Sequence, residues 1–266
     1  MTSGAAAPRK RYAAYAGFIT TPRYFDDSPQ QFLAVAPKGV GVIQRVLSIP
    51  DYAYRLDQRA ANLDQLEDAA TCLAESHAAV IGQAGTNWVH CNGTSPDEIS
   101  DLSARIGKSC GADFVMAGMA IVEGLNALGA RRITVANGYY REDWKAGINR
   151  FLEQAGFEIL WAGNLVDQGI YADLAEMEAV EVATHWDYPT RDVVQACCRA
   201  HESAPDADAV VQTGSGFRVA PYIDAIEGMV GKPVVASDAV LYWAMLKRLD
   251  LGIPVRGHGR LLASLA

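Results

Sequence analysis

The chain has 266 residues, of which 50% are hydrophobic and 20% charged, and a formal net charge of −8. This is an ordinary globular composition, and the acidic balance argues against a nucleic-acid partner. No apolar run reaches the roughly 18–20 residues of a membrane-spanning helix, and the start of the chain lacks the apolar segment of a secretory signal. The five cysteines are odd in number and unevenly spaced, so we expect reduced thiols in the cytoplasm and no zinc site.

Short apolar segments alternate with helical patterns along the chain. Strands are predicted over residues 13–20, 39–43, 78–82, 132–136, 157–160, 209–212 and 233–236. Helices are predicted over residues 56–76, 119–128, 142–154, 191–200, 222–230 and 240–249. A further helix begins at Pro96, where Ser95 and Glu98 have the spacing of a capping box. This alternation predicts an α/β fold with parallel sheets.

Two of the predicted strands run into similar glycine loops, about half the chain apart. The stretch QAGTNWVHCNG covers residues 83–93, and the stretch QTGSGFRV covers residues 212–219. The segments Thr20-Thr21-Pro22 and Asn137-Gly138-Tyr139 follow two other strands. Ligands of parallel sheets bind at the carboxyl ends of strands, so these four segments are the expected surroundings of a ligand site.

Several segments, in the right order and spacing, resemble one enzyme superfamily. Gly85-Thr86-Asn87 resembles the first active-site loop of the aspartate/glutamate racemase superfamily. The later segments look like its arylmalonate decarboxylase and maleate isomerase branch. They are residues 119–129, 131–136 with Tyr139, 208–218, and 231–235 with Ser237 and Trp243. The resemblance covers roughly residues 15–260.

The resemblance implies a specific architecture and an enzyme that needs no cofactor. Two lobes, each a parallel sheet flanked by helices, would be related by a pseudo-twofold axis, with the active site between them. On this basis we expect lobe 1 to comprise residues 13–115 and 237–266, and lobe 2 residues 116–236. Residues 1–12, which contain a basic cluster beside small residues, are expected to form a flexible tail. The resemblance and the apolar helices also suggest a homodimer or a larger homo-oligomer.

The sequence departs from this family at both positions where a thiol is expected. Enzymes of the superfamily usually carry a cysteine in each loop, on either side of a substrate carbon, and the decarboxylase keeps only the second. Here Gly85 and Gly214 occupy these positions. Racemisation by a cysteine pair and covalent isomerisation through the same position are therefore disfavoured.

The loops still offer hydrogen-bond donors for a carboxylate or a developing enolate oxygen. Glycines that merely make tight turns are the alternative interpretation. The expected substrate-binding residues are Thr21, Gly85, Thr86, Asn87, Thr213, Gly214, Ser215 and Gly216.

Four side chains are candidates for catalysis, each with a structural alternative. Tyr139 corresponds to a family tyrosine that would bind a carboxylate or pass a proton, and it could instead be a half-buried aromatic residue. His90 titrates near neutrality when unperturbed but could be a structural histidine between the lobes. Cys91 is a candidate nucleophile or a small buried residue, and Asp238 a candidate base or a helix cap. Glu178 and Glu181 are expected on a solvated helical face.

The favoured function is isomerisation or decarboxylation of a small carboxylate or dicarboxylate through a carboxylate-bound, enolate-like intermediate. One alternative is a hydrolase or hydratase acting on a carboxylate or cyclic amide, with a water activated by His90 or Asp238. Another is a ligand-binding homologue without activity. A nucleotide-binding flavodoxin-like protein is disfavoured because the loops lack GxGxxG and GxxxxGK[ST]. We expect neither a metal nor an organic cofactor.

Overall fold

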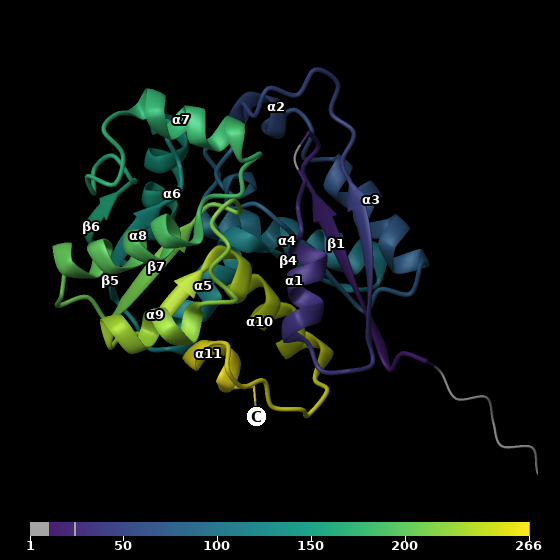
Figure 1. Ribbon diagram of the computed structural model, residues 1–266. Coiled ribbons are helices and arrows are strands. Elements are labelled where there is room, and N and C mark those ends of the chain that lie inside the picture. Colours follow the sequence, from purple (N-terminus) through teal and green to yellow (C-terminus); the bar gives the residue numbers. More distant parts are fainter. Residues whose placement is uncertain (1–10, 24, 266) are drawn as a thin grey trace, which may run out of the picture.

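The computed structural model describes residues 11–23 and 25–265 (Figure 1). Most of the predicted tail, residues 1–10, lies outside this part of the chain. Eight strands form two parallel four-stranded sheets, ordered β2-β1-β3-β4 and β6-β5-β7-β8. The strands of the first sheet are β1 (Ala14–Thr20), β2 (Val40–Val46), β3 (Val80–Gln83) and β4 (Asp113–Met116). Those of the second are β5 (Arg132–Asn137), β6 (Glu158–Gly163), β7 (Ala209–Thr213) and β8 (Val234–Ala236). The predicted α/β class is confirmed.

The central strands are apolar because helices cover both faces of each sheet. All residues of β3 and β7 are buried. The helices are α1 (Ser28–Val35), α2 (Leu56–Ala60), α3 (Gln65–Glu75), α4 (Pro96–Cys110), α5 (Ala117–Ala127), α6 (Glu142–Gln154), α7 (Leu174–Ala183), α8 (Thr190–Ser203), α9 (Ile223–Val230), α10 (Ser237–Leu249) and α11 (Gly259–Ala263). A short 3-10 helix, η1 (Thr86–Trp88), follows β3.

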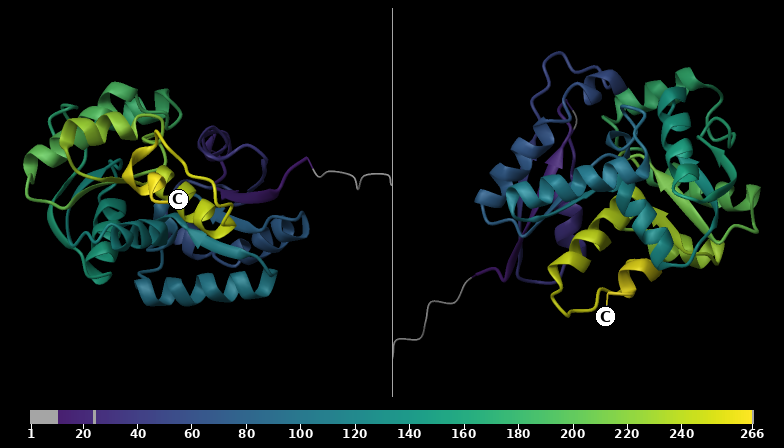
Figure 2. Two further views of the ribbon diagram at one scale, coloured as in Figure 1. Left: turned by 90° about the horizontal axis from the view of Figure 1, so that it is seen from below. Right: turned by 180° about the vertical axis from the view of Figure 1, so that it is seen from behind.

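The two sheets lie side by side and share a helical boundary. In Figure 1, β1 belongs to the right-hand lobe and β5 and β7 to the left-hand lobe. Helix α10 packs against α5 and contacts strands of both sheets, including β3 and β8. The views from below and behind show the same two-lobed arrangement (Figure 2). The carboxyl ends of β1 and β7 therefore point toward a common region between the lobes.

Local sequence signals account for several element boundaries. The Ser95 Oγ accepts a hydrogen bond from the Glu98 N–H at 3.3 Å, and the Glu98 carboxylate accepts one from the Ser95 N–H at 2.8 Å. The predicted capping box is thus confirmed.

The single helix predicted over residues 56–76 is wrong, because the chain forms α2 and α3 with a turn between them. The Asn62 side chain donates to the Gln58 carbonyl at 2.7 Å and accepts from the Gln65 amide at 2.6 Å. Asparagine competes in this way with the helical backbone. Helices α1, α7 and α11 and strand β4 were not predicted from the sequence.

Candidate active site

The carboxyl ends of strands from both sheets border one cavity. The first sheet contributes Thr21 after β1 and Gly85, Thr86 and Asn87 after β3. The second contributes Gly138 and Tyr139 after β5, and Gly214, Ser215 and Gly216 after β7. Tyr54, Arg59, Trp144 and Trp186 complete the lining. Seven of the eight predicted substrate-binding residues therefore lie together.

The two glycine loops leave their strands with the same backbone geometry. Gly85 has φ of 96° and Gly214 has φ of 103°, a region that side-chain-bearing residues rarely adopt. At the end of each strand, a buried glutamine bonds the loop. The Gln83 amide donates to the Gly85 carbonyl at 3.2 Å, and the Gln212 amide donates to the Gly214 carbonyl at 3.2 Å. The repeated loop in the sequence is therefore a repeated structural device.

Tyr139 connects the two loops at the cavity. Its hydroxyl is hydrogen-bonded to the Thr86 hydroxyl, which belongs to the first loop. The Tyr139 ring also lies 3.2 Å from where a Cβ at Gly214 would stand. Burial raises the pKa of Tyr139 to about 12, so the phenol is neutral at physiological pH and can donate a hydrogen bond. Tyr139 lines the cavity, and its role at the substrate stays a prediction.

His90 and Asn87 form a pair behind the cavity wall. The His90 Nε2 donates to the Asn87 Oδ1 at 2.9 Å, and the imidazole is packed so closely on α6 that a Cβ at Gly147 would lie 2.3 Å from it. Burial, together with the nearby arginines, lowers the pKa of His90 to about 3. A neutral imidazole that bridges η1 to α6 and orients Asn87 matches the structural alternative considered for this residue.

Cys91 and Asp238 also lie outside the cavity lining. The Cys91 thiol donates to the Trp88 carbonyl at 3.3 Å, and burial raises its pKa to about 11, so it remains protonated at neutral pH. The Asp238 carboxylate accepts hydrogen bonds from the Val219 and Ala220 N–H groups, both at 2.9 Å. It lies inside α10 and binds the end of the second loop. Burial raises its pKa to about 6.

Thr213 is the one predicted substrate-binding residue that does not line the cavity. Its hydroxyl donates to the Asn137 side chain at 2.8 Å, which couples the ends of β5 and β7.

The expectation that Glu181 faces solvent is wrong, because this side chain is only 2% exposed. The Tyr188 hydroxyl donates to it at 3.3 Å, and burial raises its pKa to about 8.

Arg59 and three aromatic residues of the lining were missed by the sequence analysis. The guanidinium carbon of Arg59 lies 4.5 Å from the centre of the Trp144 ring. Trp186 is stacked on Trp144 at 5.9 Å, and Tyr54 lies 5.0 Å from Trp186. Arg59 is four residues before Leu63 and seven before Leu66. Leu63, Leu66, Ala70 and Leu73 recur at helical spacing in the sequence, and an arginine in register with these apolar residues is the signal that could have identified it.

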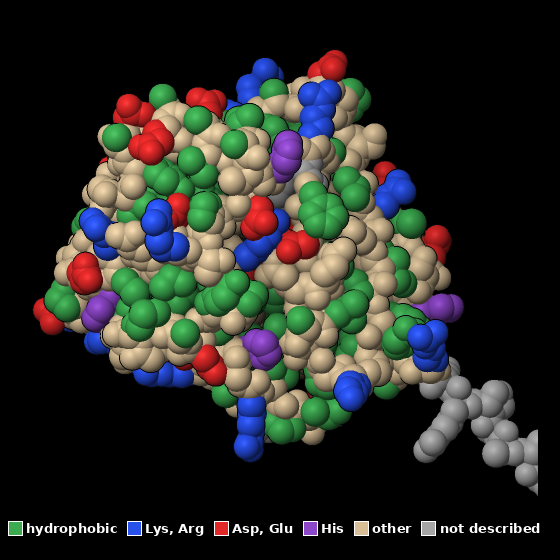
Figure 3. Space-filling view, viewed as in Figure 1, with side chains coloured by type: hydrophobic (Ala, Val, Ile, Leu, Met, Phe, Trp, Pro, Cys, Tyr) green, Lys and Arg blue, Asp and Glu red, His purple; other side chains and the backbone are tan. Residues whose placement is uncertain are grey.

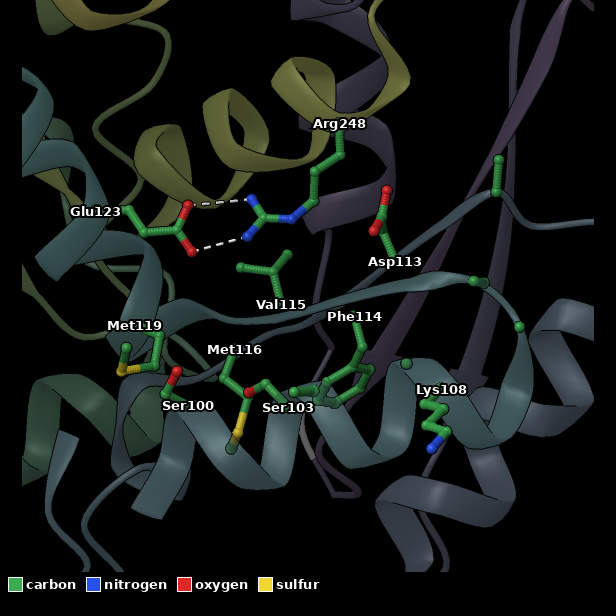
Figure 4. A pocket seen from close by; sticks show the side chains of 15 residues that line it. Ser100, Ser103, Lys108, Asp113, Phe114, Val115, Met116, Met119, Glu123 and Arg248 are labelled. Carbon is green, nitrogen blue, oxygen red and sulfur yellow. Dashed lines mark hydrogen bonds and ion pairs between the residues drawn. The ribbon is translucent and has the colours of Figure 1, made fainter. Parts of the chain in front are cut away.

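The cavity is narrow in this conformation. Its free volume is about 30 Å³, close to the share of one water molecule in the liquid. A substrate of several heavy atoms therefore fits only when some of the lining side chains move. A larger cavity of about 590 Å³ lies along the edge strand β4, where Lys108 and the Glu123–Arg248 ion pair are among the lining residues (Figure 4). Neither glycine loop contributes to it.

Other features of the described residues bear on the classes of partner. No helix of residues 11–23 and 25–265 is long and apolar enough to cross a membrane. Over the same residues, no three His, Cys, Asp or Glu side chains are placed to hold a metal ion. On the face shown in Figure 3, basic and acidic side chains are interspersed and form no continuous basic patch.

Comparison with known proteins identifies the family. An arylmalonate decarboxylase family model matches residues 54–262. The chain is 28% identical over 202 residues to arylmalonate decarboxylase of Bordetella bronchiseptica. This alignment covers 76% of this chain and 78% of that protein. It is 29% identical over 146 residues to maleate isomerase of Nocardia farcinica, in an alignment that covers 54% of this chain and 51% of that protein.

Solved structures show the same fold. The unliganded arylmalonate decarboxylase superimposes with a TM-score of 0.75 at 24% identity, covering 95% of this chain and 100% of the other. Maleate isomerase from Pseudomonas putida S16 gives 0.76 at 18% identity, covering 95% and 99%. These relatives are a decarboxylase and an isomerase, and they give no support to the hydrolase alternative. With most of its length matched by the family model, the chain belongs to the arylmalonate decarboxylase family.

Proposed function

We propose that this protein is a cofactor-independent decarboxylase of small malonate-type acids. One observation carries the proposal. Among the described residues, the lining of the cavity contains hydrogen-bond donors from both glycine loops and a neutral Tyr139, but no Cys, His, Asp or Glu. Such a site can stabilise an anion but has no thiol, imidazole or carboxylate to abstract a proton or attack a double bond.

Decarboxylation is the family reaction that needs no base in its first step. The bond between the central carbon and one carboxylate breaks, and its electron pair moves into the remaining carboxylate to form an enediolate. Carbon dioxide leaves. A proton from water then bonds to the central carbon, which gives the monocarboxylate and hydroxide. Isomerisation would instead require a nucleophile or a base at the positions that Gly85 and Gly214 occupy.

The chain's own groups would stabilise the enediolate oxygens. The hydroxyls of Thr86 and Tyr139 lie together at the cavity, and Ser215 and Gly216 line it from the second loop. Donors preorganised around a developing negative charge each contribute on the order of 3 kcal/mol to a transition state. The aromatic wall of Tyr54, Trp144 and Trp186 would surround the carboxylate that leaves as neutral carbon dioxide, where a low-polarity environment favours loss of charge.

The test is turnover in deuterium oxide. Phenylmalonate, methylmalonate and maleate would be incubated with the protein, while released carbon dioxide and the product are quantified. We expect one carbon dioxide per malonate consumed and one deuterium at the central carbon. Conversion of maleate to fumarate without carbon dioxide would replace the decarboxylase with an isomerase. Binding of these acids without turnover would support the non-catalytic alternative.

Cytoplasmic location and a homodimer or larger homo-oligomer stay predictions. Light scattering coupled to size-exclusion chromatography would measure the assembly directly. A single species of about 29 kDa, the mass of one chain at 28.6 kDa, would contradict the oligomer.

A further inference from the structure

A buried arginine lines the cavity without a carboxylate partner. Arg59 is 6% exposed, and its Nε and Nη1 have no hydrogen-bond partner among the described residues. None of the ion pairs within residues 11–23 and 25–265 includes it. Burying a charge without compensation destabilises a protein, so the position of this arginine requires an explanation.

Aromatic rings hold the guanidinium in place, and the hydroxyl of one of them, Tyr52, also interacts with it. The guanidinium carbon lies 4.5 Å from the Trp144 ring centre, 5.7 Å from that of Tyr52 and 6.0 Å from that of Trp88. Stacking stabilises the face of the cation. The donors lie in the plane of the group, so stacking leaves Nε and Nη1 without an acceptor among the described residues.

The groups that act most strongly on Arg59 are neutral. They are Tyr52, Tyr139 and Cys91. Burial raises the pKa of each, to about 12, 12 and 11. At pH 7 these neighbours carry no negative charge, and the cavity is left with a fixed positive charge beside the Thr86–Tyr139 pair.

We propose that Arg59 binds the carboxylate that the substrate retains, and thereby makes the cavity selective for small acids with an apolar substituent. The assignment of Arg59 to the carboxylate that the substrate retains rests on the proposed function. That carboxylate gains negative charge as the enediolate forms, so a guanidinium beside it stabilises the transition state more than the ground state. A guanidinium on the departing carboxylate would have the opposite effect, because that group loses its charge. The substituent packs on Tyr54, Trp144 and Trp186.

Binding of a non-reacting pair of ligands tests the charge selectivity. Phenylacetate and phenylacetamide have the same shape but differ in charge, and Trp88 and Trp144 report binding through their fluorescence. We expect the wild-type protein to bind phenylacetate roughly 30-fold more tightly, the range of a hydrogen bond to a charged group. Arg59→Gln should lose this preference and bind the amide as before, and Arg59→Lys should keep part of it. Arg55→Gln, an exposed residue paired with Asp57, is the matched control and should bind like the wild type.

The outcomes separate this inference from the decarboxylase proposal. Equal wild-type affinity for acid and amide would overturn it, and this measurement does not depend on whether Arg59→Gln folds. Unchanged phenylacetate binding by folded Arg59→Gln would also overturn it. An Arg59-dependent preference with no turnover of any malonate would leave the anion site standing and remove the decarboxylase. If malonates are turned over, kcat should fall more than KM rises in Arg59→Lys, and equal kinetics would contradict the catalytic assignment.

Discussion

The first glycine loop, residues 83–93, and the second, residues 212–219, leave their strands alike but are held by different forces. Both begin with a buried glutamine bonded to the carbonyl of a positive-φ glycine. The first loop is then fixed by neutral contacts, with His90 packed on Gly147 and bonded to Asn87. The second loop is fixed by charge through Arg218 and Asp238.

Arg218 illustrates the difference best. Its Nε lies 2.8 Å from the Asp27 carboxylate, just before α1 on the first lobe, and 3.6 Å from that of Asp187. Its Nη1 donates to the carbonyls of Trp186 and Gly216 at 3.1 and 3.2 Å. One side chain thus connects the second loop to the aromatic wall and to the other lobe. The contacts that hold the first loop carry no charge and should not weaken as the ionic strength rises. The ionic contacts that hold the second loop should weaken.

The largest expected effect comes from removing the connection between the two loops. Tyr139→Phe deletes the hydroxyl that meets Thr86 and the proposed enediolate. By analogy with the loss of one oxyanion donor, kcat for the malonate identified by turnover should fall by roughly 100- to 1,000-fold. Thr86→Val is the counterpart on the first loop, and steady-state kinetics of both variants measure the effect. Full activity of Tyr139→Phe would contradict the assigned role.

Removing the ionic support of the second loop should have the next largest effect. Arg218→Met keeps much of the side-chain length but loses the hydrogen bonds and the link to Asp27. The free energy of unfolding should fall by about 2 kcal/mol, the range for hydrogen bonds to charged groups. Urea titration at low and high salt would measure it. The wild-type advantage should shrink only slightly with salt because the pair with Asp27 is partly buried, and equal stability of the two proteins would refute the electrostatic account.

A methyl group at each loop glycine tests how closely the two loops correspond. Gly85→Ala and Gly214→Ala both force a side chain into a positive-φ conformation, at a cost on the order of 1–3 kcal/mol. At Gly214 the new Cβ would lie 3.2 Å from the Tyr139 ring, whereas at Gly85 the nearest atom, in Trp88, is 3.6 Å away. Gly214→Ala should therefore be the more destabilised in thermal unfolding. The reverse order would show that the loops relax differently.

Protonation of Glu181, which lies beside the second loop, should make a smaller contribution to the free energy of unfolding. Burial raises the pKa of Glu181 from 4.5 to about 8, and its partner Tyr188 packs on Phe217 with ring centres 4.9 Å apart. The folded state therefore binds the proton more tightly than the unfolded chain. The stabilisation is complete below pH 4.5 and is lost as the pH rises toward 8, by at most about 1.4 kcal/mol per pH unit. Glu181→Gln should flatten this slope in denaturant titrations from pH 5 to 8, and an unchanged slope would exclude Glu181 as its source.

Much of the frame of this site could be predicted from the sequence, because strand ends and glycine turns are local signals. The two loops, Thr21 and Tyr139 all lie where strand order and the family resemblance placed them, around one cavity. Arg59, Trp144 and Trp186 could not be found in that way, because they come from three separate segments outside the loops. Only tertiary packing brings these three side chains together.

His90 shows a second limit of local reasoning. Its place in a glycine loop and its ordinary pKa indicated acid–base chemistry, but burial against α6 moves that pKa to about 3. The Glu181 side chain shows the converse, since a charged residue on a helix was expected in water and lies buried beside Tyr188. In both cases burial, which depends on distant elements, decides the protonation state.

The close contact between His90 and Gly147 has a consequence for kinetics. It fastens η1 to α6 across the two lobes, so rotation of one lobe against the other would have to break a tightly packed contact. Entry to the 30 Å³ cavity must then depend on rearrangement of Trp186 and its neighbours. Side-chain and loop motions occur in nanoseconds to microseconds, whereas hinge motions of domains take microseconds to milliseconds. Substrate capture should therefore be rapid, and admission should be governed by the aromatic wall rather than by opening of the lobes.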